Sequence, residues 1–432
     1  MPEKNNRMNI DRHTPPAFKT VDALDLLPVE VFQLDNGIKV HLMAAGSQEV
    51  AKIDVLFPAG SVQAGKPLIA SATNTVMAEG TTTLTSVEIS EKIDFYGAYI
   101  GQQTNYHHSV LTLISLSHYL PETLAILEDI IKNPVFPQHE IDTFLSKRKQ
   151  EFLVEGEKVK TIAMRSFTQQ LFSKEHPYGN YLGEEHFEQL TRNDLVDFHK
   201  RVYTPEQAHI LIAGQPGDDI KALLNKHLGQ KWGDSNIPSD KLSNFDAIKP
   251  QTIVVPKAGA VQSAIKIGRR LFNKVHPDYF DVQILNTVLG GYFGSRLMTN
   301  IREEKGLTYG ISSYLMPYKH SGFMVISTEV KADNRELAVT EIFNEMERLR
   351  NEPISAEELN LVKSQMTGDM IRNFDGPFAT ADNYRGLIDL DLSPTHFQKR
   401  FNAILNMTPE RLMDLANHYF QPADFTTVIA GQ

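Results

Sequence analysis

The sequence predicts an α+β protein of two homologous domains that face each other across a cleft, each with helices packed on a largely antiparallel sheet. The first observation is a repeat: residues 190–215 and 407–432 align without a gap, 217 positions apart, and both end in Ile-Ala-Gly-Gln. The second is the order of patterns, with strand-like segments in adjacent pairs and helical segments grouped after them. The third is the length of 432 residues, which exceeds what one hydrophobic core usually holds.

The repeat itself predicts a helix followed by a strand in both copies. Its period is about half of the chain, which is far too long for a solenoid or a propeller. Two copies of one domain therefore explain it best. The identical pairs include Thr191 and Thr408, Leu195 and Leu412, Asp197 and Asp414, and Pro205 and Pro422.

The first domain is expected to span residues 30–228, after a polar N-terminal arm at 1–29. Segments rich in β-forming residues predict its strands, at 37–45, 52–58, 99–103, 109–117 and 209–213. Apolar periodicity and capping residues predict its helices, at 68–77, after an N-cap at Ser86, and at 120–132, 138–155, 159–173, 193–202 and 217–226.

A polar stretch with Gly and Pro, residues 229–250, is interpreted as the linker between the domains. The second domain, 251–432, repeats the order of the first. Its strands are expected at 252–256, 263–267, 307–315 and 322–330. Its helices are expected at 278–288, 295–304, 335–351, 356–374 and 379–387, before the repeated helix and strand at the end.

Composition excludes several classes of function. A net charge of −10 and a pI near 5.9 disfavour a nucleic-acid partner, which would need a basic face. The absence of cysteine excludes thiolate metal sites and a cysteine nucleophile. No run of 18 apolar residues predicts a membrane span, and the first 27 residues lack the apolar centre of a secretory signal. The cytoplasm is therefore the expected location.

Three motifs occur together in this chain. LDNGIKVHLM precedes a strand that ends in FPAGS, His176-Pro-Tyr-Gly follows near the middle, and LGGYFGSRLMTNIREEKGLTYGISS covers 289–313. In combination they resemble the pitrilysin/insulinase family of inverted-motif zinc metallopeptidases, which includes the mitochondrial processing peptidase and the core proteins of the bc1 complex. The resemblance extends over nearly the whole chain after residue 30, and it implies the duplicated α+β domain.

Family members that cleave peptides carry H-x-x-E-H on a helix, with two zinc ligands and a general base. The resemblance places these positions on Ser71, Asn74 and Thr75, and the third ligand near Glu151. Hydroxyls and an amide are poor zinc ligands. No histidine lies between His41 and His107, so a shift of register cannot restore the motif. We therefore expect neither catalytic residues nor a metal site in this chain.

Arg302 and Tyr309 match the pair that in this family lies across the cleft from the zinc. The resemblance implies that the guanidinium binds peptide carbonyls or a carboxylate, and that the phenol donates to the carbonyl under attack. From the residues alone, Arg302 could instead be a surface helix residue paired with a glutamate. Tyr309 could likewise be a strand aromatic packed on the sheet.

These observations predict a non-catalytic, zinc-free subunit of a heterodimeric processing or oligopeptide metallopeptidase. The partner would be an active homologue that bears H-x-x-E-H and holds the zinc, and peptides would bind in a shared chamber. One alternative is a purely structural protein, like the core proteins of the bc1 complex. Others are a peptide-binding homodimer and, less readily, an independent metallopeptidase with atypical ligands.

Overall fold

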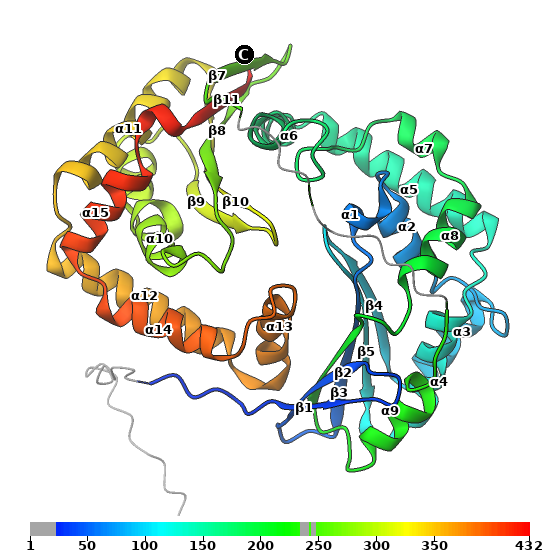
Figure 1. Cartoon of the computed structure of the whole chain (residues 1–432). Coiled ribbons are helices and arrows are strands. Elements are labelled where there is room, and N and C mark those ends of the chain that lie inside the picture. Colours follow the sequence, from blue (N-terminus) through cyan, green and yellow to red (C-terminus); the bar gives the residue numbers. More distant parts are fainter. Residues whose placement is uncertain (1–22, 234–241, 243–247) are drawn as a thin grey trace, which may run out of the picture.

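The two halves of the chain each form one sheet with its own helices, side by side in space (Figure 1). The computed structural model describes residues 23–233, 242 and 248–432, so most of the predicted arm and much of the predicted linker lie outside the described residues. The first sheet has the order β1-β2-β6-β3-β5-β4. Its strands are β1 (Glu30–Gln33), β2 (Lys39–Ala44), β3 (Val50–Phe57), β4 (Tyr99–Thr104), β5 (Ser109–Leu116) and β6 (His209–Gly214).

The second sheet repeats this arrangement without the first strand, in the order β7-β11-β8-β10-β9. Its strands are β7 (Thr252–Pro256), β8 (Gln262–Leu271), β9 (Ile311–Pro317), β10 (Gly322–Lys331) and β11 (Thr426–Gly431). Each sheet contains one parallel pair, β2 with β6 and β11 with β7, and its other pairs are antiparallel. The predicted two-domain α+β class is therefore confirmed.

The repeat found in the sequence corresponds to equivalent elements. Helix α8 (Arg192–Val202) and strand β6 in the first half match α15 (Pro409–Tyr419) and β11 in the second, at the same spacing of 217 residues. Both helices begin after a threonine, Thr191 or Thr408, whose hydroxyl accepts a hydrogen bond from the third helical N–H. Such caps fix where a helix starts, so this local signal was readable from sequence.

The other helices mostly follow the expected ranges. In the first half they are α1 (Ser61–Ala64), α2 (Ile69–Val76), α3 (Ser86–Phe95), α4 (Leu120–Lys132), α5 (Gln138–Gly156), α6 (Val159–Phe172), α7 (Glu185–Gln189) and α9 (Ile220–Leu228). In the second half they are α10 (Tyr279–Asn286), α11 (Arg335–Asn351), α12 (Ala356–Asn373), α13 (Gly376–Ile388) and α14 (Thr395–Asn406). Strand β1 and helices α1, α7 and α14 were not expected from the sequence.

Two local predictions need correction. The N-cap of α3 is Thr85 rather than Ser86, because Thr85 forms a reciprocal capping box with Glu88. The segment predicted as a helix over 295–304 becomes a π-helix at Met298–Glu304, called η3. A second π-helical turn, η2 (Thr287–Gly291), ends α10. π-Helical turns widen the backbone and often occur at functional sites.

The halves are joined by an exchange of helices. Helix α6 of the first half packs its apolar side chains, including Phe167 and Phe172, against the second sheet at Phe323 and Val428. In return, α13 of the second half packs Tyr384 and other side chains against the first sheet, on residues of β2, β3, β5 and β6. Figure 1 shows both helices between the halves. Each sheet is thus covered on one face by its own helices and on the other by a helix from the opposite half.

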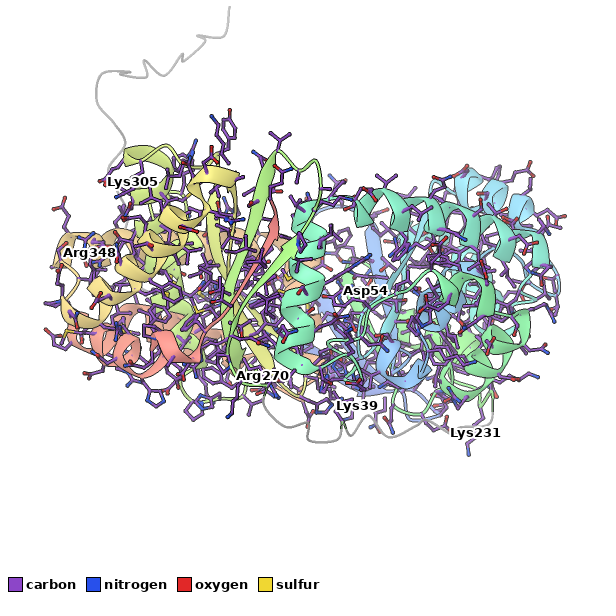
Figure 2. All side chains as sticks on the ribbon, turned by 90° about the horizontal axis from the view of Figure 1, so that it is seen from above. Lys39, Asp54, Lys231, Arg270, Lys305 and Arg348 are labelled. Atoms are coloured by element: carbon purple, nitrogen blue, oxygen red, sulfur yellow. The ribbon has the colours of Figure 1, made fainter. Side chains whose placement is uncertain are left out.

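Polar contacts reinforce this joint. The ammonium of Lys52 on β3 pairs with Asp382 on α13, and His41 Nδ1 lies 3.1 Å from the Tyr384 hydroxyl. In the view from above, Arg270 lies near the boundary between the halves (Figure 2), in keeping with its guanidinium 5.2 Å from the ring centroid of Phe172. The halves therefore form one continuous structure.

Candidate functional site

The three positions that correspond to the zinc motif lie on α2, where they point in two directions. Ser71 and Thr75 are one helical turn apart and line the same pocket. Asn74 is instead only 1% exposed and points into the core. Its Nδ2 donates to the carbonyl oxygens of Gln103 (3.1 Å) and Val110 (3.4 Å), and its Oδ1 accepts from the Tyr203 hydroxyl (3.2 Å). Asn74 is therefore a structural amide that ties α2 to β4 and β5.

The pocket beside Ser71 and Thr75 has a volume of about 380 Å³ and lies between α2 and α5. Its lining is Ser71, Thr75, Val76, Glu79, Glu140, Thr143, Phe144, Lys147, Arg148 and Glu151. Sequence reasoning therefore placed Ser71, Thr75 and Glu151 together correctly. It missed the two cations, Lys147 and Arg148, which share the α5 segment with Glu151.

The donors in this pocket do not fit zinc. Glu151 Oε2 accepts a hydrogen bond from Arg148 Nη1 at 2.7 Å, so this carboxylate already has a cationic partner on the same helix. Ser71 donates its hydroxyl to the carbonyl of Leu68. Within the described residues, no group of three or more His, Asp or Glu side chains is arranged to hold a metal ion. Zinc needs nitrogen, thiolate or carboxylate ligands held together, so no metal chemistry follows from this site.

Arg302 lies on the π-helix η3, in the second half. Its guanidinium carbon lies 4.4 Å from the ring centroid of Phe293, a cation–π contact. Nη1 is buried and has no hydrogen-bond partner among the described residues. Stacking on an aromatic ring restricts a long side chain and leaves N–H donors for another group. Arg302 is thus held by a ring, rather than by the glutamate pairing considered from the sequence.

Tyr309 precedes the edge strand β9 and is 96% exposed, so it is not a strand aromatic packed on the sheet. The residue before it fixes the turn. Thr308 Oγ1 donates to the Glu329 carbonyl (2.8 Å) and accepts from the Gly310 N–H (3.1 Å). A fixed backbone therefore presents the phenol to solvent.

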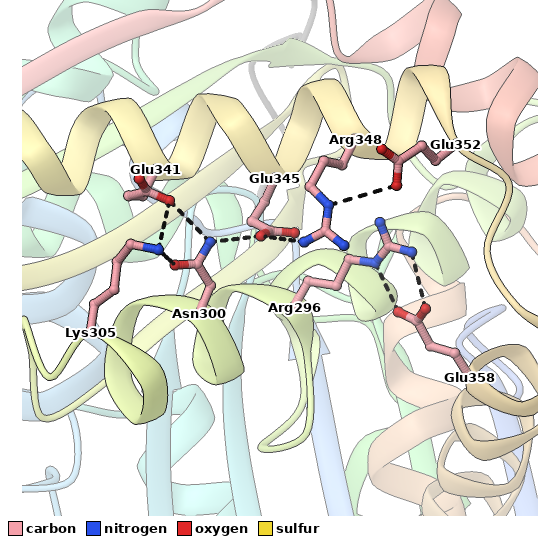
Figure 3. A network of polar contacts seen from close by, with 8 residues as sticks. All are labelled: Arg296, Asn300, Lys305, Glu341, Glu345, Arg348, Glu352 and Glu358. Carbon is pink, nitrogen blue, oxygen red and sulfur yellow. Dashed lines mark hydrogen bonds and ion pairs between the residues drawn. The ribbon is translucent and has the colours of Figure 1, made fainter.

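A polar network anchors the segment that carries Arg302 (Figure 3). Asn300 Nδ2 donates to the buried Glu345 at 2.7 Å, and Lys305 Nζ donates to Asn300 Oδ1 at 2.8 Å. Arg296 binds Glu358 through two parallel hydrogen bonds of 2.9 and 3.0 Å. Bidentate arginine–carboxylate pairs fix orientation as well as distance. Sequence reasoning missed these anchors because their partners lie on α11 and α12, 41–62 residues away.

The structure does not bring Arg302 and Tyr309 to the pocket on α2 and α5. Neither residue is among the pocket's lining residues, which all come from the first half. Lys305, close to both in sequence, lies in the half opposite to Asp54 in Figure 2. The two parts of the predicted site therefore belong to separate surfaces of this chain.

The His176-Pro-Tyr-Gly motif lies at the joint between the halves. The Tyr178 hydroxyl is 2.7 Å from His107 Nε2 and accepts from the main-chain N–H of His320 at 3.3 Å. His176 Nδ1 accepts from the Tyr178 N–H, and its pKa is lowered to about 4 by burial, with smaller effects of Arg270 and His320. These buried side chains thus connect the segment after α6 with the β4–β5 turn and the β9–β10 turn.

Known proteins resemble this chain in sequence. Residues 39–178 match the family described as insulinase (peptidase family M16), and residues 189–366 match the peptidase M16 inactive domain. An uncharacterized zinc protease of Bacillus subtilis, YmxG, is 25% identical over 304 residues, which cover 69% of this chain and 72% of that protein.

Two solved structures show the same fold. A peptidase M16 inactive domain from Pseudomonas fluorescens superposes with a TM-score of 0.85 at 21% identity, covering 94% of this chain and 98% of that one. The periplasmic protease PqqL of Escherichia coli gives a TM-score of 0.79 at 18% identity, covering 98% of this chain and 49% of the longer protein.

Within the described residues, no helix is both long and apolar enough to cross a membrane.

Proposed function

The chain belongs to the insulinase (M16) peptidase family, and we propose that it is a non-catalytic subunit that works beside an active homologue bearing H-x-x-E-H. One observation carries the proposal. In the pocket where the active members of the family would hold zinc, Ser71 and Thr75 replace the imidazoles and Arg148 binds Glu151. A chain that hydrolysed peptides alone would need a metal-bound water at this position.

The second support is the state of Arg302 and Tyr309. Both lie away from this chain's own pocket, and the Tyr309 phenol is exposed. An exposed phenol and a stacked guanidinium with spare donors suit a substrate held against another subunit. In the complex, Arg302 would bind peptide carbonyls or a carboxylate, and Tyr309 would donate to the carbonyl under attack in the partner's zinc site.

Each sheet also ends in an edge strand that could take up a peptide. β4 is the last strand of the first sheet and β9 the last of the second. A peptide can add to such an edge through main-chain hydrogen bonds. β4 lies next to α2, whose Asn74 binds the carbonyl of Gln103 on that strand. A peptide on β4 would thus lie close to the altered zinc position.

The experiment mixes Arg302→Ala or Tyr309→Phe with an H-x-x-E-H homologue, confirms the complex by size exclusion, and measures kcat and KM. Loss of one donor to developing negative charge costs roughly 10²–10³ in rate, so Tyr309→Phe should lower kcat. Arg302→Ala should mainly raise KM, because it acts on ground and transition states alike. Arg372→Ala, an exposed arginine on α12 paired with Asp369, is the matched control.

The outcomes separate the alternatives. If both variants match the unmodified chain in kcat and KM, the pair does not bind substrate, and a purely structural role is favoured. If the chain and its homologue do not associate but peptides bind this chain alone, a peptide-binding homodimer is favoured. An independent peptidase would show activity without a partner. The cytoplasmic location stays a prediction, and fractionation of cells would test it.

A further inference from the structure

A second pocket, of about 570 Å³, lies in the second half, apart from the pocket on α2 and α5. It is formed by the loop after β8 and by parts of α10, α14 and α15. Its lining is Lys274, Val275, His276, Pro277, Phe280, Asp281, Leu392, His396, Lys399, Asn402, Ala403, Asn406, Met407 and Arg411. Its volume is within the range of sites for small organic ligands, roughly 300–1,000 Å³.

The charges in this pocket are unbalanced. Asp281 is its one carboxylate, and Arg411 already binds it at 3.0 Å while also binding Asp278 at 2.8 Å. Lys274 and Lys399 supply two further positive charges. Across the part of the chain that the structure describes, neither ammonium group forms an ion pair with a carboxylate.

Lys274 is the more constrained of the two lysines. Its Nζ donates to the carbonyl oxygen of Gly386 at 3.3 Å, a long hydrogen bond. Burial lowers the pKa of Lys274, and the nearby carboxylate of Asp389 offsets only part of this effect, so the ammonium group has lost hydration that its surroundings do not fully replace. An anion in the pocket would compensate for that loss.

The positive charges of this pocket also act on the imidazole of His396. The pKa of His396 is lowered to about 4, mainly by burial and to a smaller extent by the positive charges of Lys274, Lys399 and Arg400. Arg400, also on α14, has a buried Nε that finds no hydrogen-bond partner in the part of the chain that the structure describes. Three cationic side chains on the β8–α10 loop and on α14 therefore act on one small volume.

The remaining lining offers an apolar surface. The ring of Phe280 lies 4.6 Å from that of His396, centroid to centroid, and Leu392, Ala403 and Met407 extend this surface. A site with a few polar groups over an apolar floor is the usual form of a small-molecule pocket. The floor favours a ligand that carries a hydrophobic body rather than a bare inorganic ion.

We propose that this pocket binds a small organic anion, a phosphate or carboxylate attached to an apolar body, with the anion between Lys274 and Lys399 and the body against Phe280. The proposal is independent of the peptidase partner, because no residue of this pocket belongs to the α2–α5 pocket or to the Arg302–Tyr309 surface.

The test is calorimetric titration of the full chain with phenyl phosphate, 3-phenylpropionate and inorganic phosphate at low and at physiological salt. Phenyl phosphate or 3-phenylpropionate should bind at least several-fold more tightly than inorganic phosphate, and salt should weaken the binding. The tighter of the two aromatic probes identifies the anionic group. Lys399→Gln, at an exposed position, should weaken that binding about tenfold, the effect of one charge-assisted hydrogen bond.

Lys274→Met should weaken binding at least as much as Lys399→Gln. Its matched control is Lys266→Met, because Lys266 likewise has a pKa lowered by burial and donates to a neutral oxygen, the Ser327 hydroxyl. If the Lys274 variant does not fold, the exposed Lys399 decides. Absence of binding by both aromatic probes at millimolar concentration, or binding that Lys399→Gln leaves unchanged, would overturn the proposal.

Discussion

Asn74→Glu, the change that restores the family's general base in sequence, should destabilise the first half. The amide of Asn74 donates to two strand carbonyls and accepts from the Tyr203 hydroxyl, in a position that is only 1% exposed. A glutamate there has no donors when ionised, and it places negative charge against the carbonyl oxygens of Gln103 and Val110. The longer side chain must also fit a packed interior.

The size of the effect follows from these contacts. Leaving a buried polar group unsatisfied costs about 1–3 kcal/mol, and an uncompensated buried charge about 3–5 kcal/mol. We therefore expect Asn74→Glu to lose about 3–5 kcal/mol of unfolding free energy. For a domain of this size, about 2–4 °C of Tm accompanies each kcal/mol, so the first half should melt about 6–20 °C lower.

The assay is thermal unfolding followed by circular dichroism, with urea unfolding as a second measure. Two controls isolate the buried position. Ser71→His with Thr75→His changes only pocket-lining residues and should shift Tm by a few degrees at most. Asn74→Ala removes the amide without adding charge and should fall between the unmodified chain and Asn74→Glu. If Asn74→Glu melts within about 2 °C of the unmodified chain, the assignment of Asn74 as a structural amide is refuted.

The remaining predictions concern zinc, pH and the joint between the halves. The purified chain should hold no stoichiometric zinc and should cleave no peptide alone. This prediction is contradicted if elemental analysis finds one tightly bound zinc per chain and if chelation removes both the zinc and a peptidase activity. The pKa of His41 is lowered to about 4, mainly by burial and less by His209 and Lys39, and that of His176 is similarly lowered. Between pH 4 and 6.5 these histidines therefore bind protons in the unfolded chain but not in the folded one. The free energy of unfolding, measured with urea, should be highest above pH 6.5 and should fall as the pH decreases toward 4. Phe167 is fully buried where α6 packs on the second sheet, so Phe167→Ala should lower the free energy of unfolding by about 3–5 kcal/mol. The variant should also be cleaved faster at the joint in limited proteolysis. Unchanged digestion would argue against the helix exchange.

The sequence alone determined the duplication, the class of fold and the absence of the zinc motif. These are local or repeated signals: the capping threonines Thr191 and Thr408 start equivalent helices, and periodicity identifies strands and helices within short windows. The identity of Ser71, Asn74 and Thr75 likewise needs no folding to read. The lack of imidazole at these positions already argued against zinc.

Only the tertiary structure decided how these residues are used. Asn74 is structural because its partners on β4, on β5 and after α8 lie 29, 36 and 129 residues away, and no local pattern reports contacts of that range. The exchange of α6 and α13 joins segments that are far apart in the sequence, such as His41 and Tyr384, which are 343 residues apart. The stack of Arg302 on Phe293 depends on two π-helical turns. The ammonium groups of Lys274 and Lys399 line one pocket only because α14, which was not expected from the sequence, packs beside the β8–α10 loop. Propensity fixes local conformation, but the contacts that give side chains their roles depend on which distant surfaces the folded chain brings together.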